Sequence, residues 1–282
     1  MEPSVASSPL NKMALSVAGS DPSGGAGIQA DLKTFATLGV YGGAVITSLT
    51  VQNSTGVQSV HHVEAGLVAA QLQAVLADMP VSHIKTGMLG SRATVERLAD
   101  VFAGFNGELV CDPVLRSTSG SPLVEREAMP AFLGGIVTRA TVLTPNAIEL
   151  ETLSGRNCGN EAGIRAACAD LLERFPSLRA IAVTGGHTDP DGSAVTDFLG
   201  LRSSGDKIDW SKISHPRIAT RNGHGTGCTF ASAFAAHHLH TGDYRAAFAR
   251  AVAYVAEALR LSASARMGAG NGPLLHHLVR SS

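Results

Sequence analysis

The sequence predicts a three-layer α/β/α fold with a largely parallel central sheet. Short apolar runs alternate with amphipathic stretches almost from end to end, which is typical of parallel strands covered by helices on both faces. The 282 residues are 44% hydrophobic and 16% charged, enough for a sizeable core. No Pro/Ser/Gly linker and no repeat of fixed period divides the chain. We therefore expect one domain over residues 13–282, after a loose tail over 1–12.

The first half of the chain is predicted to begin with a buried strand over 13–19, "MALSVAG". The helix expected over 27–39 places Ile28, Leu32, Phe35 and Leu38 three or four residues apart, on one face. The same patterns then predict strand, helix, strand and helix over 42–52, 65–78, 82–88 and 92–104.

The second half continues the alternation. A buried strand is expected over 107–114, and a helix near 125–137 leads to a strand over 140–146. Helices over 146–154 and 160–174, a strand over 179–186, β structure with turns over 193–218, and helices near 225–240 and 243–263 complete the prediction.

Composition excludes several classes of partner. The net charge is −1 and the chain has no basic run, so neither nucleic acid nor an anionic membrane is expected. No apolar segment reaches the ~18–20 residues that span a bilayer, and residues 1–12 lack the features of a signal peptide. The four cysteines form no CxxC pair or zinc-site spacing. We expect a cytoplasmic protein that binds a small molecule.

Polar clusters follow the predicted strands at their carboxyl ends, where open α/β sheets bind ligands. This placement indicates an enzyme with its active site at that edge of the sheet. The clusters are Gly19–Gly27, Gln52–Asn53, Lys85–Met88, Asp112–Val114, Thr144–Glu149 and Thr184–His187.

The stretch Gly223–Thr229, "GHGTGCT", opens a small-residue helix. Glycines let the backbone approach a ligand, and the first helical turn offers unpaired N–H groups for an anion. A thiol at this point, Cys228, is expected to have a lowered pKa. The alternative is that Cys228 is a small buried hydrophobic residue.

The glycine-rich loop "AGSDPSGGAGIQADL" lacks the lysine and hydroxyl of a P-loop and also fails the GxGxxG pattern of dinucleotide-binding enzymes. It is either a ligand-binding loop or a tight strand-to-helix turn. In "TPNAIELE", Asn146 and Glu149 lie three residues apart, which suits either a Mg²⁺ site or a helix cap. Asp112 could likewise help to hold a metal or phosphate, or cap its loop.

These segments, in this order, resemble the hydroxymethylpyrimidine/phosphomethylpyrimidine kinases of thiamine biosynthesis, a family with the ribokinase-like fold. The resemblance covers nearly the whole chain. It rests on "SVAGSDPSGGAGIQADLKTFATLGVYGGAVITSLTVQN", "KTGML", "DPV", "TPNAIELE", "TGGH", "GHGTGCT" and "GAGNGP".

The resemblance implies an ATP- and Mg²⁺-dependent kinase that phosphorylates 4-amino-5-hydroxymethyl-2-methylpyrimidine and then its monophosphate, as a homodimer. Gln52 would bind the pyrimidine edge, Gly19 and Asp31 would border the site, and Met88 and Val114 would lie against the ring faces. Asp112, Asn146 and Glu149 would serve Mg²⁺ and the ATP phosphates, near Thr184 and Gly186. The backbone of Gly225, Thr226 and Gly227 would form an anion hole, with Cys228 as the base.

One position departs from the family pattern. Thr184 stands where the family usually has a lysine, and a threonine donates one hydrogen bond without a charge. Pyridoxal kinases of the same fold group commonly carry threonine there, so a pyridoxal or pyridoxine kinase is the alternative enzyme. A non-catalytic vitamin-binding module is the alternative from another class, although it would have no use for phosphoryl-transfer residues.

Overall fold

The computed structural model describes residues 12–115, 128–186, 192–203 and 207–280. The expected tail, residues 1–12, therefore lies outside the described residues except for Lys12. One sheet of nine strands organises this part of the chain, in the order β3-β2-β1-β4-β5-β6-β7-β8-β9. The six strands from β2 to β7 in that order are parallel neighbours, whereas β3, β8 and β9 pair antiparallel at the two edges.

The first half of the chain alternates as predicted, with one additional strand. Its elements are β1 (Met13–Ser20), α1 (Gly27–Thr37), β2 (Tyr41–Asn53), β3 (Gly56–His62), α2 (Ala65–Asp78), β4 (Val81–Thr86) and α3 (Arg92–Phe102). Strand β3 was not predicted. It is an edge strand with no fully buried residue, so its sequence lacks the apolar run that marks the inner strands.

The second half contains shorter strands than predicted. Its elements are β5 (Glu108–Cys111), α4 (Met129–Ala131), the π-helical η3 (Phe132–Val137), β6 (Val142–Leu143), α5 (Ala147–Ser154), α6 (Glu161–Arg174), β7 (Ala180–Val183), β8 (Ala194–Arg202), β9 (Ile208–Pro216), α7 (Thr226–Thr241), α8 (Tyr244–Ser262) and η4 (His276–Leu278).

The helix predicted near 125–137 was only partly right. Residues 125–127 lie outside the described residues, and the remainder is one short α-helical turn followed by wider π-helical turns. Gly134 and Gly135 lie in that wider segment, and glycine is a poor α-helix former.

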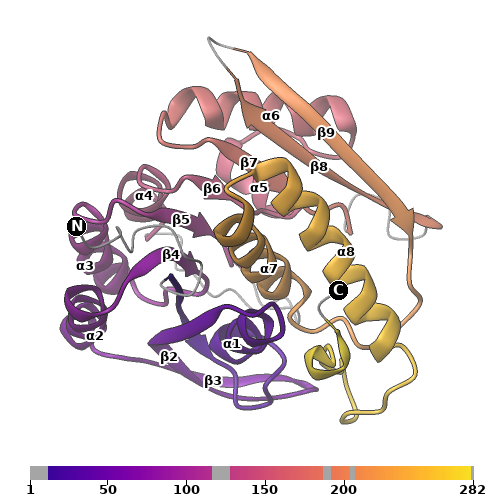
Figure 1. The fold of residues 1–282 in the computed structure, drawn as a ribbon, viewed down its shortest axis with the longest axis horizontal. Coiled ribbons are helices and arrows are strands. Elements are labelled where there is room, and N and C mark those ends of the chain that lie inside the picture. The colour runs from indigo at the N-terminus through magenta and orange to yellow at the C-terminus, as the bar shows by residue number, and fades with distance from the viewer. Residues whose placement is uncertain (1–11, 116–127, 187–191, 204–206, 281–282) are drawn as a thin grey trace, which may run out of the picture.

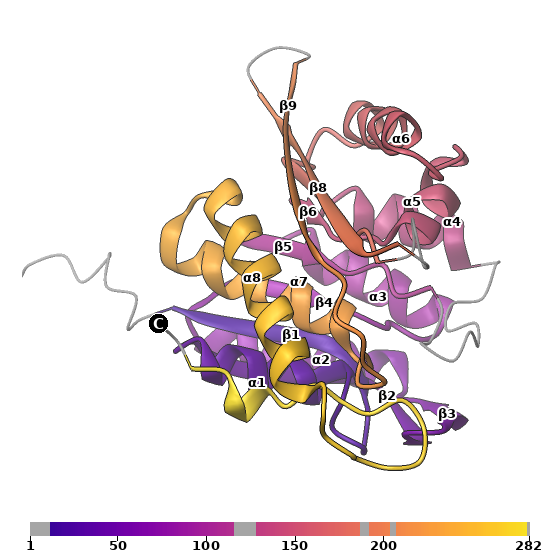
Figure 2. The same cartoon turned by 90° about the vertical axis from the view of Figure 1, so that its right-hand side faces the viewer.

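Two hydrophobic clusters cover the two faces of the sheet, as the three-layer prediction requires. Side chains of β1 alternate between them: Leu15 and Val17 join one cluster, and Ala14 joins the other. Helices α2, α3, α5 and α6 pack on the first face, and α1, α7 and α8 on the second (Figures 1 and 2). The α/β/α fold is confirmed.

Among the described residues, no helix is long and apolar enough to cross a membrane. Strands β8 and β9 extend as a long hairpin at one edge of the sheet (Figure 2).

Candidate active site

A cavity of about 640 Å³ lies at the carboxyl ends of the parallel strands. The polar segments that were expected at this edge contribute to its wall from six strand ends and from the first turn of α7. Of the residues predicted for the site, those that line the cavity are Gly19, Gln52, Met88, Asp112, Val114, Asn146, Glu149, Thr184, Gly186, Gly225, Thr226, Gly227 and Cys228. His187, from one of the predicted clusters, lies outside the described residues.

Asp31 is the exception, and its expected place at the border of the site was wrong. Its side chain is fully buried in the interior and does not line the cavity. The carboxylate accepts hydrogen bonds from Ser16 Oγ at 2.6 Å and Ser232 Oγ at 2.7 Å, and it pairs with Lys85 Nζ at 2.9 Å. Asp31 therefore neutralises a buried lysine behind the site.

Lys85 joins this buried pair to the cavity wall. Its Nζ lies 3.5 Å from Asp112 Oδ2, and the lysine is fully buried in β4. Burial alone would lower the pKa of Lys85, but Asp31, Cys228 and Asp112 outweigh it and raise the pKa. The lysine thus stays charged and places a fixed positive charge under the site.

Cys228 does not have the lowered pKa that its position at a helix N-terminus predicted. Burial, together with the charges of Asp112 and Asp31, raises the pKa of the thiol to about 12, against the opposing effects of Lys85 and the Gly27 N–H. The thiol nevertheless faces the cavity, is partly exposed, and hydrogen-bonds Asp112. It is protonated at neutral pH.

The turn before Cys228 leaves the first turn of α7 without a side-chain cap. Gly225 is the N-cap residue in the left-handed conformation, with φ of 84°, and no side chain bonds the N–H groups that follow. A Cβ on Gly225 would lie 1.8 Å from the carbonyl oxygen of Gly25, so only glycine fits between the two loops. N–H groups at the positive end of a helix dipole favour an anion as their partner.

Asn146 and Glu149 form the capping box of α5, which was one of the two interpretations of their spacing. Asn146 Oδ1 accepts the N–H groups of Ile148 and Glu149, each at 2.9 Å. Glu149 Oε2 accepts the N–H of Asn146 at 2.9 Å. Burial, and secondly the charge of Asp112, raises the pKa of Glu149 to about 8. Both residues also line the cavity.

Of the three residues predicted to hold Mg²⁺, only Asp112 and Glu149 suit a divalent cation. Among the described residues, no group of three or more His, Cys, Asp or Glu side chains gathers as a metal site. Asp112 and Glu149 are two carboxylates close enough to disfavour each other's ionisation, and a cation between them would relieve this. Mg²⁺ is commonly held by one or two carboxylates with waters and substrate phosphates. The oxygen of Asn146 already accepts two N–H groups.

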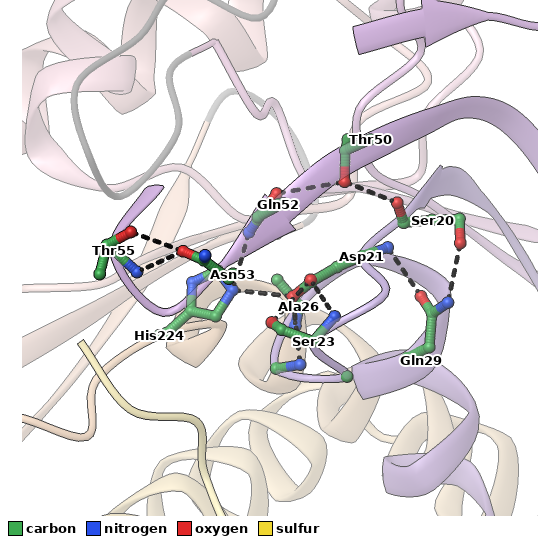
Figure 3. Close-up of polar contacts among 12 residues, drawn as sticks. Ser20, Asp21, Ser23, Ala26, Gln29, Thr50, Gln52, Asn53, Thr55 and His224 are labelled. Carbon is green, nitrogen blue, oxygen red and sulfur yellow. Dashed lines mark hydrogen bonds and ion pairs between the residues drawn. The ribbon is translucent and has the colours of Figure 1, made fainter. Parts of the chain in front are cut away.

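Gln52 lies within hydrogen-bond distance of His224, to which the sequence analysis gave no role (Figure 3). His224 Nε2 lies 3.0 Å from Gln52 Nε2 and 2.8 Å from Asp21 Oδ2. Asp21 folds the first loop around itself by accepting backbone N–H groups from Ser23, Gly25 and Ala26. The loop, strand β2 and the turn before α7 are thereby joined at one histidine.

The region around Thr184 contains a cation that the sequence did not place there. Arg217, after β9, lines the same cavity, and its guanidinium donates to the carbonyl oxygen of Gly186 at 3.4 Å. Asp197 accepts the Gly185 N–H at 2.8 Å and bonds His215 at 3.2 Å, and this bond raises the pKa of His215. Val252, Val255 and Leu259 of α8 add an apolar wall.

Two residues of the site lie in segments that the sequence analysis quoted, but neither was given a role there. Lys85 is a charge within the apolar strand "SHIKTGM", and His224 lies inside "GHGTGCT". Arg217 had no such mark, because it lies thirty-three residues beyond Thr184 in the sequence, just after β9.

A family model and the curated relatives agree on one family. The model of the phosphomethylpyrimidine kinase family matches residues 21–275. The hydroxymethylpyrimidine/phosphomethylpyrimidine kinase of Rhizobium meliloti is 40% identical over 96% of this chain and 98% of that protein.

Two solved structures share the fold. The pyridoxal kinase of Staphylococcus aureus in complex with ADP is 29% identical, covers 94% of this chain and 93% of its own, and has a TM-score of 0.82. The phosphomethylpyrimidine kinase of Clostridium difficile is 31% identical, covers 87% of this chain and 98% of its own, and has a TM-score of 0.75.

Proposed function

The chain belongs to the phosphomethylpyrimidine kinase family, and from this premise we propose the reaction that its cavity performs. It transfers the γ-phosphoryl group of ATP to the hydroxyl of 4-amino-5-hydroxymethyl-2-methylpyrimidine, and a second phosphoryl group to the monophosphate, in thiamine biosynthesis. The observation that carries the proposal is that the residues assigned to the pyrimidine and those assigned to the phosphates line one cavity, together with the uncapped N-terminus of α7.

Gln52, Met88 and Val114 form the proposed pyrimidine side. A side-chain amide both donates and accepts, so it matches the edge formed by a ring nitrogen and an amino group. Met88 and Val114 cover the apolar ring faces. Gly19 leaves room for Met88, because a Cβ at Gly19 would lie 2.9 Å from Met88 Cε.

The turn Gly225–Gly227 holds the transferred group in this proposal. Phosphoryl transfer depends on positioning and charge neutralisation, and bare N–H groups at a helix N-terminus supply both. Cys228, hydrogen-bonded to Asp112, accepts the proton of the attacking hydroxyl as its own proton passes to the carboxylate. Lys85 compensates the charge on Asp112 from behind.

Asp112 and Glu149 would hold Mg²⁺, with Asn146 orienting Glu149 through the capping box. When bound, Mg²⁺ offsets the charge of the ATP phosphates. Thr184 and Gly186 border the phosphate path, and Arg217 supplies the positive charge that Thr184 lacks. In this arrangement Arg217→Ala raises the KM for ATP, whereas Thr184→Lys restores some affinity in that variant.

Steady-state ATP consumption with the hydroxymethylpyrimidine tests the function directly. Gln52→Ala leaves an edge of the buried ring unpaired, which costs on the order of 1–3 kcal/mol. We expect it to raise the KM for the pyrimidine far more than the KM for ATP. Equal effects on the two KM values would place Gln52 outside the pyrimidine side.

Pyridoxal is the second candidate substrate, favoured by the structural similarity to a pyridoxal kinase and by Thr184. We propose that the hydroxymethylpyrimidine is preferred, because the relatives that match nearly the whole chain at 35–40% identity are named as pyrimidine kinases. The ratio of kcat/KM for the two alcohols decides between them.

The setting of the reaction is also a proposal. We propose that residues 13–282 act as one kinase domain, in the cytoplasm, as a homodimer. Tyr41, Leu49 and Val51 of the edge-proximal strand β2 are exposed apolar side chains, which suits burial against a second copy. Sedimentation of the parent and of Leu49→Glu tests the dimer, and fractionation of the source cells tests the location.

A further inference from the structure

His224 has two hydrogen-bond neighbours at the same ring nitrogen, Nε2. Asp21 Oδ2 lies 2.8 Å away and the Gln52 amide lies 3.0 Å away (Figure 3). The imidazole is buried and packed against the first loop, since a Cβ on Gly25 would lie 2.4 Å from His224 Cδ2. The ring therefore has little freedom to satisfy one neighbour by moving away from the other.

Asp21 determines that Nε2 of His224 carries a hydrogen. Its carboxylate accepts the N–H groups of Ser23, Gly25 and Ala26 and the hydroxyl of Ser23. Burial would raise the pKa of Asp21, but the hydrogen bonds from His224 and Ser23 outweigh it and lower the pKa to about 2. An ionised carboxylate only accepts, so His224 Nε2 must carry a hydrogen and donate it, whether the ring is neutral or charged.

Thr50 lies at the other end of the Gln52 amide, and its oxygen is available to accept a hydrogen bond there. Its hydroxyl donates to the carbonyl oxygen of Ser20 at 3.0 Å, so the Thr50 oxygen is left to accept. Gln52 Oε1 is placed 3.4 Å from that oxygen, a contact in which Thr50 could donate only by giving up its shorter bond to Ser20. Amide oxygen and nitrogen are nearly identical in shape, and their partners decide which atom lies where.

Both neighbours select the same amide orientation. We infer that the Gln52 amide is turned over relative to its placement in Figure 3, so that Oε1 shares the His224 Nε2–H with Asp21 and the NH₂ group faces Thr50 and the cavity, and that His224 is a positioning residue which fixes this orientation. The amide is thereby prevented from turning over to suit a different ligand edge.

A fixed amide discriminates between two kinds of pyrimidine, an inference that rests on the proposed function. The hydroxymethyl group must face the α7 turn, so the ring cannot turn over either. Oε1 then accepts from an exocyclic amino group while the NH₂ group donates to the ring nitrogen. The 4-oxo counterpart of the substrate presents an acceptor and a donor in the opposite places, and a fixed amide opposes both. A freely turning amide would accept either ring.

Kinetics with the 4-amino substrate and its 4-oxo counterpart test the inference. A site built to hydrogen-bond its ligand rejects the mismatched analogue strongly, so we expect the parent to prefer the amino ring by on the order of 10²-fold or more in kcat/KM. His224→Leu removes the donor and should shrink that ratio by about tenfold or more, as the mismatch disappears. His224→Gln, which restores an N–H of similar reach, should keep the ratio within about threefold of the parent.

The ratio of kcat/KM for the 4-amino and 4-oxo rings reports amide orientation alone. Damage to the α7 turn would lower kcat/KM for both rings by the same factor and leave the ratio unchanged. An unchanged ratio in a folded His224→Leu protein overturns the inference. Failure of the parent to phosphorylate the amino pyrimidine would instead refute the proposed function.

Nitrogen-15 spectra of histidine-labelled enzyme give a test that needs no substrate and does not depend on the leucine variant folding. The His224 signals are assigned by their loss in His224→Gln. A hydrogen on Nε2 in the parent supports the inference, and an unprotonated Nε2 overturns it.

Discussion

Helices α5 and α7 both begin at the cavity, but their first turns are completed in opposite ways. At α5, Asn146 and Glu149 bond the first backbone N–H groups in a reciprocal capping box. At α7, Gly225 occupies the N-cap position, and no side chain bonds the N–H groups beyond it. Both turns follow strands of the same sheet and line the same cavity.

The difference separates a turn whose first N–H groups are capped by side chains of the chain itself from one that has no side-chain cap. Unpaired N–H groups at a helix start need a partner from a side chain, water or a ligand. Helix α1, whose first turn also borders the cavity, again lacks a side-chain cap. The helices whose first turns do have side-chain caps are α2, α3, α5, α6 and α8.

Gly225→Ala should break the α7 turn and has the largest expected effect. The new Cβ would lie 1.8 Å from the Gly25 carbonyl oxygen, at a φ that favours glycine. Loss of one preorganised donor costs on the order of 10²–10³ in kcat, so we expect at least this loss. Strain of about 1–3 kcal/mol should also lower the free energy of unfolding.

Gly223→Ala is the matched control in the same turn. The nearest atom to its Cβ would be Thr226 Oγ1 at 4.0 Å, and this glycine does not adopt a positive φ. Thermal unfolding of Gly223→Ala should match the parent. Near-parent turnover by Gly225→Ala would show that the turn does not hold the transferred group.

Cys228→Ser tests whether the residue that follows the turn takes part in chemistry. Serine can still donate to Asp112, but a hydroxyl is a weaker acid than a thiol and passes its own proton on less readily, and general-base assistance contributes about 10²–10⁴-fold. We expect kcat to fall on the order of 10²-fold with little change in either KM. Turnover within a few-fold of the parent would make Cys228 a packing residue.

A separate alkylation experiment tests the raised pKa of the Cys228 thiol. Because the pKa of Cys228 is about 12, alkylation of the free enzyme by iodoacetamide should be slow at neutral pH and accelerate as the pH rises well above it. Rapid alkylation of this residue at pH 7 would contradict the raised pKa.

Glu149 makes the α5 turn sensitive to pH. Its pKa is about 8 in the folded protein against an ordinary value of 4.5, so folding favours the protonated form. The resulting stability is present below pH 4.5 and is lost as the pH rises through 8, with a slope of up to about 1.4 kcal/mol per pH unit. Glu149→Gln should flatten that decline in denaturant unfolding. A parallel decline in both proteins would contradict the raised pKa.

Asn146→Ala has the smallest expected effect. It removes the oxygen that accepts two N–H groups of α5, and loss of such a cap costs about 0.5–2 kcal/mol. Asn146→Asp keeps a capping oxygen and should retain most of the stability. If Asn146→Ala instead abolished turnover without destabilising the protein, the cap would be secondary to a role toward ATP.

The periodicity of the chain was sufficient for the sequence to predict the alternating elements and the edge at which the site lies. Buried parallel strands have continuous apolar runs, and their carboxyl ends meet at one edge, so Gln52, Asp112 and Thr184 could be expected together. Strand β3 was missed because an edge strand with exposed residues carries no such run. The resemblance to a known family, rather than periodicity, supplied the individual roles.

What the sequence determined by itself was which segments form strands and helices and which glycines open the turn at α7, because both follow from local side-chain chemistry. Only the tertiary structure decided which way each side chain faces and which charges surround it. Asp31 lies one helical turn from the cavity loop, yet it points inward to Lys85. Cys228 begins a helix, yet burial beside Asp112 and Asp31 raises its pKa. The orientation of Gln52 depends on His224, 172 residues away, because hydrogen bonds between distant segments exist only after folding.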